Sequence, residues 1–316
     1  MSGGRDEKKA TRAAYGETLI ELAEAGLDVF AVEADLAGST TTAKFAERYP
    51  ARHINVGIAE QNMVGIAAGI SLADAGKVVF TGSFAVFATG RTYDQIRNTV
   101  AYAQLNVNIV PTHAGISVGA DGGSHQMVED IALMRVLPNM QVLVPADYLS
   151  AKAAIHLAAA SPGPSYVRLG REPLPQLYSS TEGFAFGRAT VLRMGDAVSI
   201  IACGAEVSQA LAAAELLAAR GIDAEIIDAF SIKPLDGETI LASLDKTGVA
   251  VTCEEHSVIG GLGEAVAALL AEHPGLLRKP LRRIGVQDRF GTSGDFNQLF
   301  GDYGLDAQAI CRAVVE

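Results

Sequence analysis

The chain has 316 residues, 49% of them apolar, and is long enough to bury the cores of two ordinary domains. Its formal net charge of -11, with no long basic run, disfavours a nucleic acid or an anionic membrane as a partner. Three cysteines far apart, without a C-x-x-C pair, indicate neither a disulfide framework nor a zinc site, so we expect a reducing compartment.

The first fifteen residues are rich in charge and lack the apolar core of a signal peptide. Elsewhere no apolar run approaches the roughly 20 residues that a membrane-spanning helix needs. We therefore predict a soluble protein of the cytoplasm.

From residue 28 to residue 170, short β-branched runs alternate with alanine-rich amphipathic segments. In chain order these segments cover residues 28–35, 60–76, 77–84, 92–104, 107–115, 141–147, 149–161 and 165–170. Strand and helix patterns in alternation predict an α/β fold with a doubly wound, mostly parallel sheet. Ligands of such sheets bind beyond the carboxyl ends of the strands, where Asp35, His113 and Arg168 follow apolar runs.

After Tyr178 the sequence becomes polar and irregular, and a second alternation of strand and helix patterns then begins. Its segments cover residues 197–204, 206–221, 223–230, 248–256 and 261–273. We predict a second, smaller α/β domain of the same kind, and assign residues 1–180 and 187–316 to the two domains. There is no heptad or solenoid repeat, so neither a coiled coil nor a scaffold array is indicated.

The segment N-V-G-I-A-E-Q-N-M places Glu60 and Gln61 at the start of an apolar helix that runs to about Asp74. An acid in the first turn is favoured by the helix dipole, which alone would explain Glu60. A carboxylate can also exchange a proton with a ring nitrogen of a cofactor, provided that the site is shielded and the pKa of the acid is tuned.

Phe84 and Phe87 are three residues apart and would be neighbours on a helix. Two phenylalanines commonly fill a core. In a chain with 11 Phe and no Trp, such a pair beside a strand end can instead sandwich a planar heterocycle, if the fold brings Glu60 within reach.

The stretch T-H-A-G-I-S-V-G-A-D-G-G-S-H-Q carries His113, Asp121 and His125 on a glycine-rich loop after an apolar run. A lone histidine is usually structural or exposed. Two histidines and an aspartate within thirteen residues at a strand end favour a site that binds hydroxyl groups or moves protons. Because cysteine and glutamate partners at a ligand spacing are missing, these residues do not indicate a metal site.

Arg168 and Arg171 follow the last predicted strand of the first unit, and Arg12 lies near its start. Arginine is most often a surface residue, but its guanidinium can donate two parallel hydrogen bonds to a phosphate. The G-G-L-G-E-A turn at residues 260–265 could also bind an anion at a helix N-terminus, on weaker evidence. The common dinucleotide and nucleoside triphosphate motifs, G-x-G-x-x-G after the first strand and G-x-x-x-x-G-K-[ST], are absent.

Seven motifs in one order make the chain resemble the carboxyl-terminal half of transketolase. They are A-T-R at 10–12, A-D-L-A-G-S at 34–39, G-I-A-E-Q-N-M at 57–63, G-S-F-A-V-F at 82–87, the loop at 112–126, L-P-N-M-Q-V-L-V-P-A-D at 137–147 and G-R-E-P-L-P-Q-L at 170–177. The likeness covers essentially the whole chain. It implies a thiamine-diphosphate-binding pyrimidine domain followed by a transketolase C-terminal domain.

The resemblance implies an enzyme that transfers a two-carbon ketol unit from a ketose phosphate to an aldose phosphate. Glu60 would hydrogen-bond the aminopyrimidine ring of thiamine diphosphate, and the cofactor-binding residues would be Asp35, Glu60, Phe84 and Phe87. The family usually has a third aromatic residue in this pocket, at the position of Gly90. Tyr93, three residues later, could take its place.

The same resemblance assigns the sugar to the loop and to the arginines. His113 and Asp121 would contact hydroxyls near the reacting carbons, and with Glu60 they form the implied catalytic set. The terminal phosphate would be held by Arg12, Ser39, His125 and Arg171.

A full transketolase also carries an amino-terminal domain whose G-D-G signature binds Mg²⁺ and the diphosphate, and this chain has neither the signature nor the room. The resemblance therefore implies one subunit of a split enzyme, with no metal ligands of its own. An amino-terminal partner subunit would supply the metal site, and the family-like assembly is an α2β2 heterotetramer.

The sequence is also compatible with three other kinds of protein. The 1-deoxy-D-xylulose-5-phosphate synthases have stretches similar to residues 119–126 and to K-P-L-D at 233–236, but they are usually one long chain with Asp in place of His113. A 2-oxo acid dehydrogenase β subunit has this size but generally lacks the D-G-x-x-H-Q loop. A non-catalytic regulatory module predicts decay of the site residues, whereas Glu60 and Arg171 are intact. The sugars are not identified.

Overall fold

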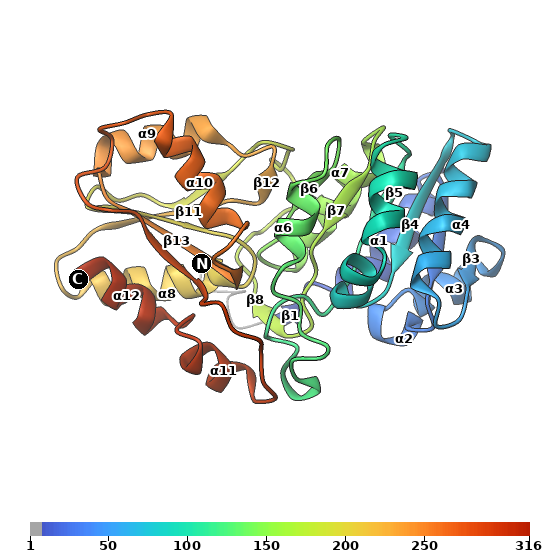
Figure 1. Cartoon of the computed structure of the whole chain (residues 1–316), viewed down its shortest axis with the longest axis horizontal. Coiled ribbons are helices and arrows are strands. Elements are labelled where there is room, and N and C mark those ends of the chain that lie inside the picture. Colours follow the sequence, from blue (N-terminus) through green and yellow to red (C-terminus); the bar gives the residue numbers. More distant parts are fainter. Residues whose placement is uncertain (1–7) are drawn as a thin grey trace.

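The computed structural model describes residues 8–316 and places two α/β units side by side along the long axis of the molecule (Figure 1). Residues 1–7, which hold much of the charged start of the chain, lie outside the described residues. Among the helices of the described part, none is long and apolar enough to cross a membrane.

The first unit is built on a seven-stranded sheet in the order β12-β6-β7-β5-β4-β2-β3. Neighbouring strands are parallel except for the pair of β12 and β6. Strands buried on both faces explain why the sequence shows continuous apolar runs here. The bounds are β2 Asp28–Glu33, β3 His53–Asn55, β4 Lys77–Gly82, β5 Val107–Ile109, β6 Gln141–Leu143, β7 Ser165–Val167 and β12 Ser231–Lys233.

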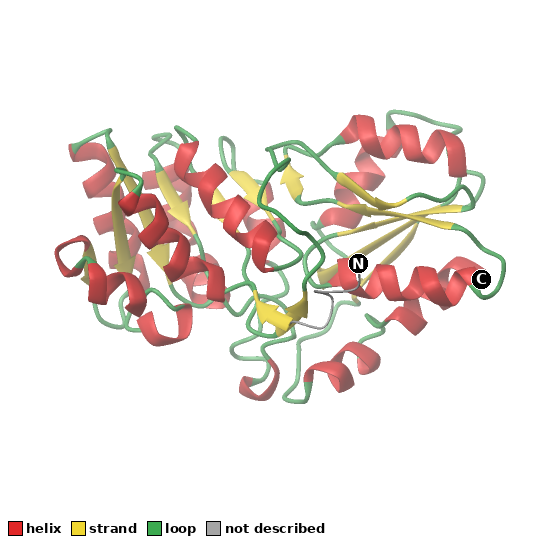
Figure 2. Cartoon of the chain, turned by 180° about the vertical axis from the view of Figure 1, so that it is seen from behind, coloured by secondary structure: helices red, strands yellow, loops and turns green. Residues whose placement is uncertain are grey.

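Helices cover both faces of this sheet (Figure 2). Helices α1 and α7 pack on one face around Tyr15, Phe45 and Phe80, while Met63 and Ile96 belong to the core of the other face. The α-helices are α1 Ala13–Glu24, α2 Ala37–Thr40, α3 Ala43–Arg48, α4 Glu60–Ala73, α5 Tyr93–Gln95, α6 Asp130–Arg135 and α7 Tyr148–Ala160, and η1 Pro50–Arg52 and η4 Gly119–Asp121 are 3-10 turns.

The helix predicted at residues 92–104 is not a regular α-helix. Only α5 is α-helical, between two π-helical segments, η2 Val86–Arg91 and η3 Ile96–Ala101. The hydroxyls of Thr89 and Thr92 donate to the carbonyls four residues earlier at 2.6 Å, and so compete with the backbone N–H groups for those acceptors. Such π-helical segments are often found at functional sites.

The second unit contains a five-stranded sheet in the order β14-β13-β10-β11-β9, parallel except for β9. The predicted fold class of two doubly wound, mostly parallel sheets is therefore confirmed. The strands of the second unit are β9 Thr190–Arg193, β10 Val198–Ala202, β11 Ala224–Asp228, β13 Ala250–Ser257 and β14 Arg282–Val286. Its helices are α8 Glu206–Ala218, α9 Gly237–Thr247, α10 Leu262–Ala271, α11 Phe296–Asp302 and α12 Ala307–Val315.

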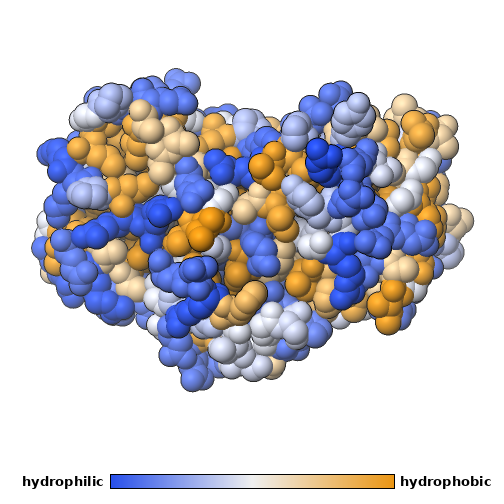
Figure 3. Space-filling view, in the orientation of Figure 1, coloured by the Kyte–Doolittle hydropathy of each residue, from blue (hydrophilic) through white to orange (hydrophobic). Residues whose placement is uncertain are grey.

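The two units are joined by more than the connecting chain. Strand β12 belongs in sequence to the second unit but completes the first sheet, which the sequence patterns did not predict. A small ribbon of β1 Lys8–Ala10 and β8 Pro173–Pro175 lies near the junction (Figure 1). On the face seen in Figure 3, hydrophilic and apolar side chains are interspersed, and a groove between α6, β12 and α10 runs along the junction.

Candidate active site

Polar side chains meet beyond the carboxyl ends of β2, β4 and β5, the place that the sequence patterns predicted. Two of them have left-handed backbone conformations, with φ of 64° at Asp35 and 62° at His113. Such values are uncommon for residues other than glycine and occur often at functional sites.

Glu60 begins α4, whose preceding residue Ala59 provides no side-chain cap. The Glu60 side chain is 4% exposed, and its Oε1 accepts a hydrogen bond from Nη1 of Arg91 at 3.0 Å. Gln61 donates from Nε2 to the carbonyl of Arg91 at 3.1 Å, which ties the helix start to the end of η2. A nearly buried carboxylate that is held in place by one cationic partner can share a proton with a bound ligand.

The aromatic pair of Phe84 and Phe87 is linked to this carboxylate through Arg91. Their ring centroids are 6.1 Å apart with an interplanar angle of 17°, and the Arg91 guanidinium carbon is 4.3 Å from the centroid of Phe87. Arg91 therefore contacts both Glu60 and Phe87. The two parallel rings and the acid offer apolar faces and one polar contact to a planar heterocycle that carries a ring nitrogen.

The sequence patterns did not identify Arg91 as a site residue, although it lies four residues after Phe87 and directly after Gly90. Tyr93, the substitute considered for the absent third aromatic residue, packs instead against the core of the first unit. Arg91, the residue after Gly90, therefore covers the ring of Phe87.

His113 links the aromatic pair to the arginines. Its imidazole stacks on Phe84 at a centroid distance of 3.8 Å, and its Nε2 lies 3.4 Å from Nη1 of Arg12. Because a guanidinium can only donate, Nε2 must accept, and the ring proton is on Nδ1, which lies 2.7 Å from Oγ1 of Thr112. Burial, and then the charges of Arg12, Arg171 and His125, lower the pKa of His113 to about 3.

We expect the imidazole of His113 to stay neutral at pH 5, because its pKa of about 3 lies well below the ordinary value of 6.5. Its contribution to the free energy of unfolding is complete above about pH 6.5 and is lost as the pH falls toward about 3. NMR of ¹⁵N-labelled histidine, assigned with a His113→Asn variant, checks this. A His113 signal that titrates near pH 6.5 contradicts the prediction.

Two guanidinium groups form the other end of the site. Arg12 donates to the carbonyl of Ser39 at 3.0 Å, and Arg171 donates to the carbonyl of Val118 and lies 3.7 Å from Oδ2 of Asp121. Burial, and then the charge of Arg171, lower the pKa of Arg12. Two like charges held in one region are stabilised by an anion, so this end suits a phosphate or a similar group.

Two further predicted residues, His125 and Asp35, differ in how closely they contact the aromatic pair and the arginines. His125 lies against Phe87, at a centroid distance of 5.5 Å, and its Nδ1 is 3.0 Å from Oγ of Ser124. The carboxylate of Asp35 accepts from Nδ2 of Asn55 at 3.1 Å, and within residues 8–316 it makes no hydrogen bond or ion pair with another predicted site residue.

Two anion-binding interpretations are wrong. Arg168 is 6% exposed and donates from Nε and Nη2 to the carboxylate of Asp130 at 2.7 and 3.2 Å, so its charge is already paired inside the fold. The turn at residues 260–265 is occupied by the chain itself, since Leu262 and Gly263 donate their backbone N–H groups to the carboxylate of Glu254 at 2.7 and 2.8 Å.

Both units of the chain match known protein families. Residues 7–176 match the family "Transketolase, pyrimidine binding domain", and residues 187–310 match "Transketolase, C-terminal domain". A Methanocaldococcus jannaschii protein assigned by name to the transketolase C-terminal section is 49% identical over 98% of this chain and 96% of its own. A subunit of the 6-deoxy-6-sulfo-D-fructose transketolase of a Clostridium species is 43% identical over 98% and 95%.

A solved structure is similar in the same way. It is described as a split-gene transketolase, inactive β4 tetramer. Its chain is 46% identical, superposes with a TM-score of 0.87, and each of the two chains is covered to 98%. The likeness therefore extends over both units of the fold.

Proposed function

The chain belongs to the transketolase family, and from this premise we propose that it is the carboxyl-terminal subunit of a split, thiamine-diphosphate-dependent transketolase. With its partner it would transfer a two-carbon ketol unit from a ketose phosphate to an aldose phosphate. The observation that carries the proposal is the single cluster of a shielded carboxylate, two nearly parallel phenylalanine rings, a buried histidine and two arginines.

The residues present fit the aminopyrimidine half of the cofactor. Phe84 and Phe87 would hold the planar ring, and Glu60 would share a proton with its ring nitrogen. When bound, thiamine diphosphate supplies a nucleophilic carbon and an electron sink for cleavage of a carbon–carbon bond. We place the Mg²⁺ and diphosphate ligands on the partner subunit, as the split arrangement requires.

The sugar would lie between the histidine and the arginines. His113 and Asp121 would contact its hydroxyls near the reacting carbons, and neutral His113 can accept a hydrogen bond there at Nε2 without carrying charge into the site. The terminal phosphate would be held by Arg12, Ser39, His125 and Arg171.

The identity of the sugar is a separate part of the proposal. The Clostridium relative is named for a sulfonated ketose, and a sulfonate presents three oxygens and a negative charge much as a phosphate does. Guanidinium groups bind either anion. A ketose phosphate is our first choice, and 6-deoxy-6-sulfo-D-fructose is the donor to test beside it.

The proposed assembly is α2β2, with the amino-terminal subunit completing the cofactor site. The similar solved chain is described as an inactive tetramer of β chains, which supports the expectation that this chain alone is inactive. We assign residues 1–180 to the pyrimidine-binding domain and 187–316 to the C-terminal domain.

The proposal is tested by measuring ketol transfer from xylulose 5-phosphate to ribose 5-phosphate with thiamine diphosphate and Mg²⁺. The chain is assayed alone and mixed with a candidate amino-terminal transketolase subunit from the same organism. Activity only in the mixture supports the split enzyme. Activity of the chain alone refutes it, and a mixture that binds the cofactor but transfers from no ketose phosphate or sulfonate favours a non-catalytic or synthase role.

Replacing Arg171 by Met should raise the KM for a ketose phosphate about 10- to 100-fold, because one charged hydrogen-bond donor to the phosphate is lost. The KM for the same ketose without its phosphate should stay within about threefold. Arg193→Met is the matched control, since Arg193 pairs with Asp223 in the second unit, away from the site. Equal effects on both donors contradict the assignment of Arg171 to the phosphate.

A further inference from the structure

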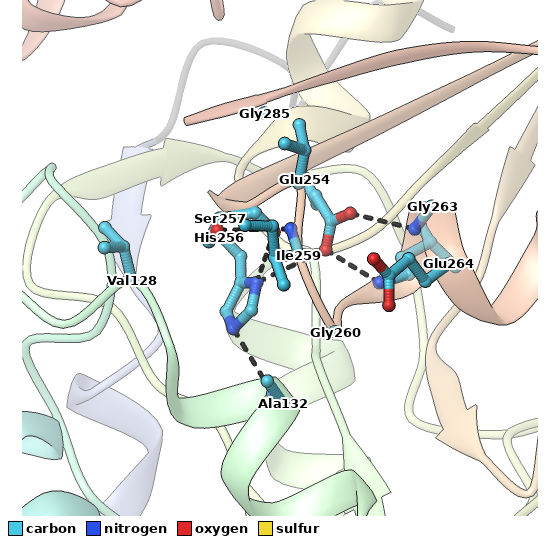
Figure 4. Close-up of polar contacts among 12 residues, drawn as sticks. Val128, Ala132, Glu254, His256, Ser257, Ile259, Gly260, Gly263, Glu264 and Gly285 are labelled. Atoms are coloured by element: carbon cyan, nitrogen blue, oxygen red, sulfur yellow. Dashed lines mark hydrogen bonds and ion pairs between the residues drawn. The ribbon is translucent and has the colours of Figure 1, made fainter. Parts of the chain in front are cut away.

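Three consecutive residues near the end of β13 each bind a different part of the molecule. Glu254 accepts from the first backbone N–H groups of α10, within the second unit. His256 accepts at Nε2 from the backbone N–H of Ala132, in helix α6 of the first unit, at 3.3 Å (Figure 4). Glu255 lies between them in the strand, so its side chain points to the opposite face.

Glu255 reaches the base of the loop that carries the proposed sugar contacts. We call residues 113–127 the substrate loop. The Glu255 side chain is buried, and its Oε1 accepts from the backbone N–H of Ser117 at 2.6 Å. Gly115 has a φ of +80°, and a Cβ there would overlap the Glu255 carboxylate, so the glycine is required by this contact as well as by the turn.

The substrate loop is closed at its base, and Glu255 binds just inside that closure. Gly115 and Met127 exchange backbone hydrogen bonds of 2.7 and 3.3 Å, and the segment between them holds Asp121 and His125. Gln126 adds a second contact with the second unit, since its Nε2 donates to the carbonyls of Ile116 and Thr292 at 2.9 Å each. The position of the loop is therefore set from the second unit as well as from the first.

The strand segment that carries Glu255 is itself fixed. Nη2 of Arg168 donates to the backbone carbonyl of Glu255 at 2.9 Å and to that of Met127 at 3.3 Å. One buried guanidinium thus connects β13 to the closing end of the substrate loop. The carboxylate therefore meets Ser117 from a strand that is itself held against the first unit.

We propose that Glu255 is a positioning residue for the sugar site, supplied by the C-terminal domain through its hydrogen bond to Ser117. This inference rests on the proposed function for the role of the loop in sugar binding, whereas the hydrogen bond between Glu255 and Ser117 is independent of that function. It gives the second unit, which provides none of the predicted cofactor or sugar contacts, a defined role in the reaction.

The contact is tested first by hydrogen exchange measured by mass spectrometry on the whole chain. Glu255→Ala should speed exchange in peptides covering the substrate loop about 10- to 100-fold, and Glu255→Gln, which keeps an acceptor oxygen, should restore most of the protection. Glu225→Ala is the matched control, because Glu225 is a buried carboxylate on the same sheet that pairs with Lys246. Unchanged exchange in Glu255→Ala overturns the proposal.

Gly115→Ala gives a second route to the same contact if Glu255→Ala does not fold. It keeps Glu255 in the chain but fills the space that its carboxylate occupies beside residue 115, so the carboxylate must move away from the loop. It should therefore loosen the substrate loop while leaving exchange in β10 and β11 unchanged. Loss of protection over the whole chain would instead indicate a structural role alone and would contradict the proposal.

The functional consequence is tested with the reconstituted enzyme. Glu255→Ala should raise the KM for the ketose donor about tenfold, with thiamine diphosphate affinity within about threefold of the unmodified enzyme. A lower kcat with unchanged KM would contradict positioning, because it indicates only a smaller folded fraction. Absence of ketol transfer by the unmodified mixture refutes the proposed function, whereas an unchanged loop in Glu255→Ala refutes this inference alone.

Discussion

Glu60→Gln should lower the ketol transfer rate of the reconstituted enzyme by about 100- to 10,000-fold, the range expected when a general acid–base group is removed. The substitution keeps the size and planarity of the side chain, so the start of α4 should retain its packing. What it removes is the ability to exchange a proton with a ring nitrogen and the charge that pairs with Arg91.

The rate should be measured together with thiamine diphosphate binding, followed by near-ultraviolet circular dichroism of the mixture. Gln61→Ala is the matched control, because Gln61 is the next residue of the helix and makes its hydrogen bond to the backbone of Arg91. It should change the rate by less than about tenfold. A Glu60→Gln enzyme with nearly normal turnover would remove the central residue of the proposed mechanism.

Arg168→Met should lower the free energy of unfolding by about 3–5 kcal/mol, because it leaves the carboxylate of Asp130 buried without its cationic partner. Asp130 is fully buried, and among residues 8–316 its carboxylate would keep one side-chain donor, the hydroxyl of Tyr166 at 2.6 Å. The lost hydrogen bonds to Met127 and Glu255 would also weaken the junction of the two units. Chemical denaturation of the isolated chain measures the change.

The double variant Arg168→Met with Asp130→Leu should recover much of this loss, since no unpaired buried charge remains. Arg193→Met provides a comparison with a more exposed ion pair, for which a loss of less than about 1 kcal/mol is expected. If Arg168→Met is as stable as the unmodified chain and instead raises the KM for sugar phosphates, the phosphate interpretation of Arg168 was correct.

The contrast between Arg168 and Arg171 shows where prediction from the sequence ended. Both follow the same strand, and alternating apolar and polar runs correctly placed them near the carboxyl edge of the sheet. Their roles depend on partners distant in sequence. Arg168 meets Asp130, 38 residues earlier, whereas Arg171 faces the substrate loop. Periodicity predicts burial and edges of a sheet but not which polar side chains pair there.

The same limit explains the other differences. Arg91 reaches Glu60 across 31 residues, and the π-helical turns that present it depend on threonine hydroxyls rather than on apolar spacing. Strand β12 is three residues long and pairs with a strand 90 residues earlier, so no local pattern could assign it to the first sheet. The motif order, in contrast, depends on residue identity and was sufficient to indicate the family.

Strand β12 also affects how the molecule can be divided. Removing the second unit at the linker would take β12 away and expose the backbone N–H and C=O groups along one side of β6, whose residues Val142 and Leu143 are apolar. An open edge of this kind is a site for self-association between copies of a protein. The first unit expressed alone should therefore tend to aggregate, unless residues 231–233 are retained or replaced by a strand that covers β6.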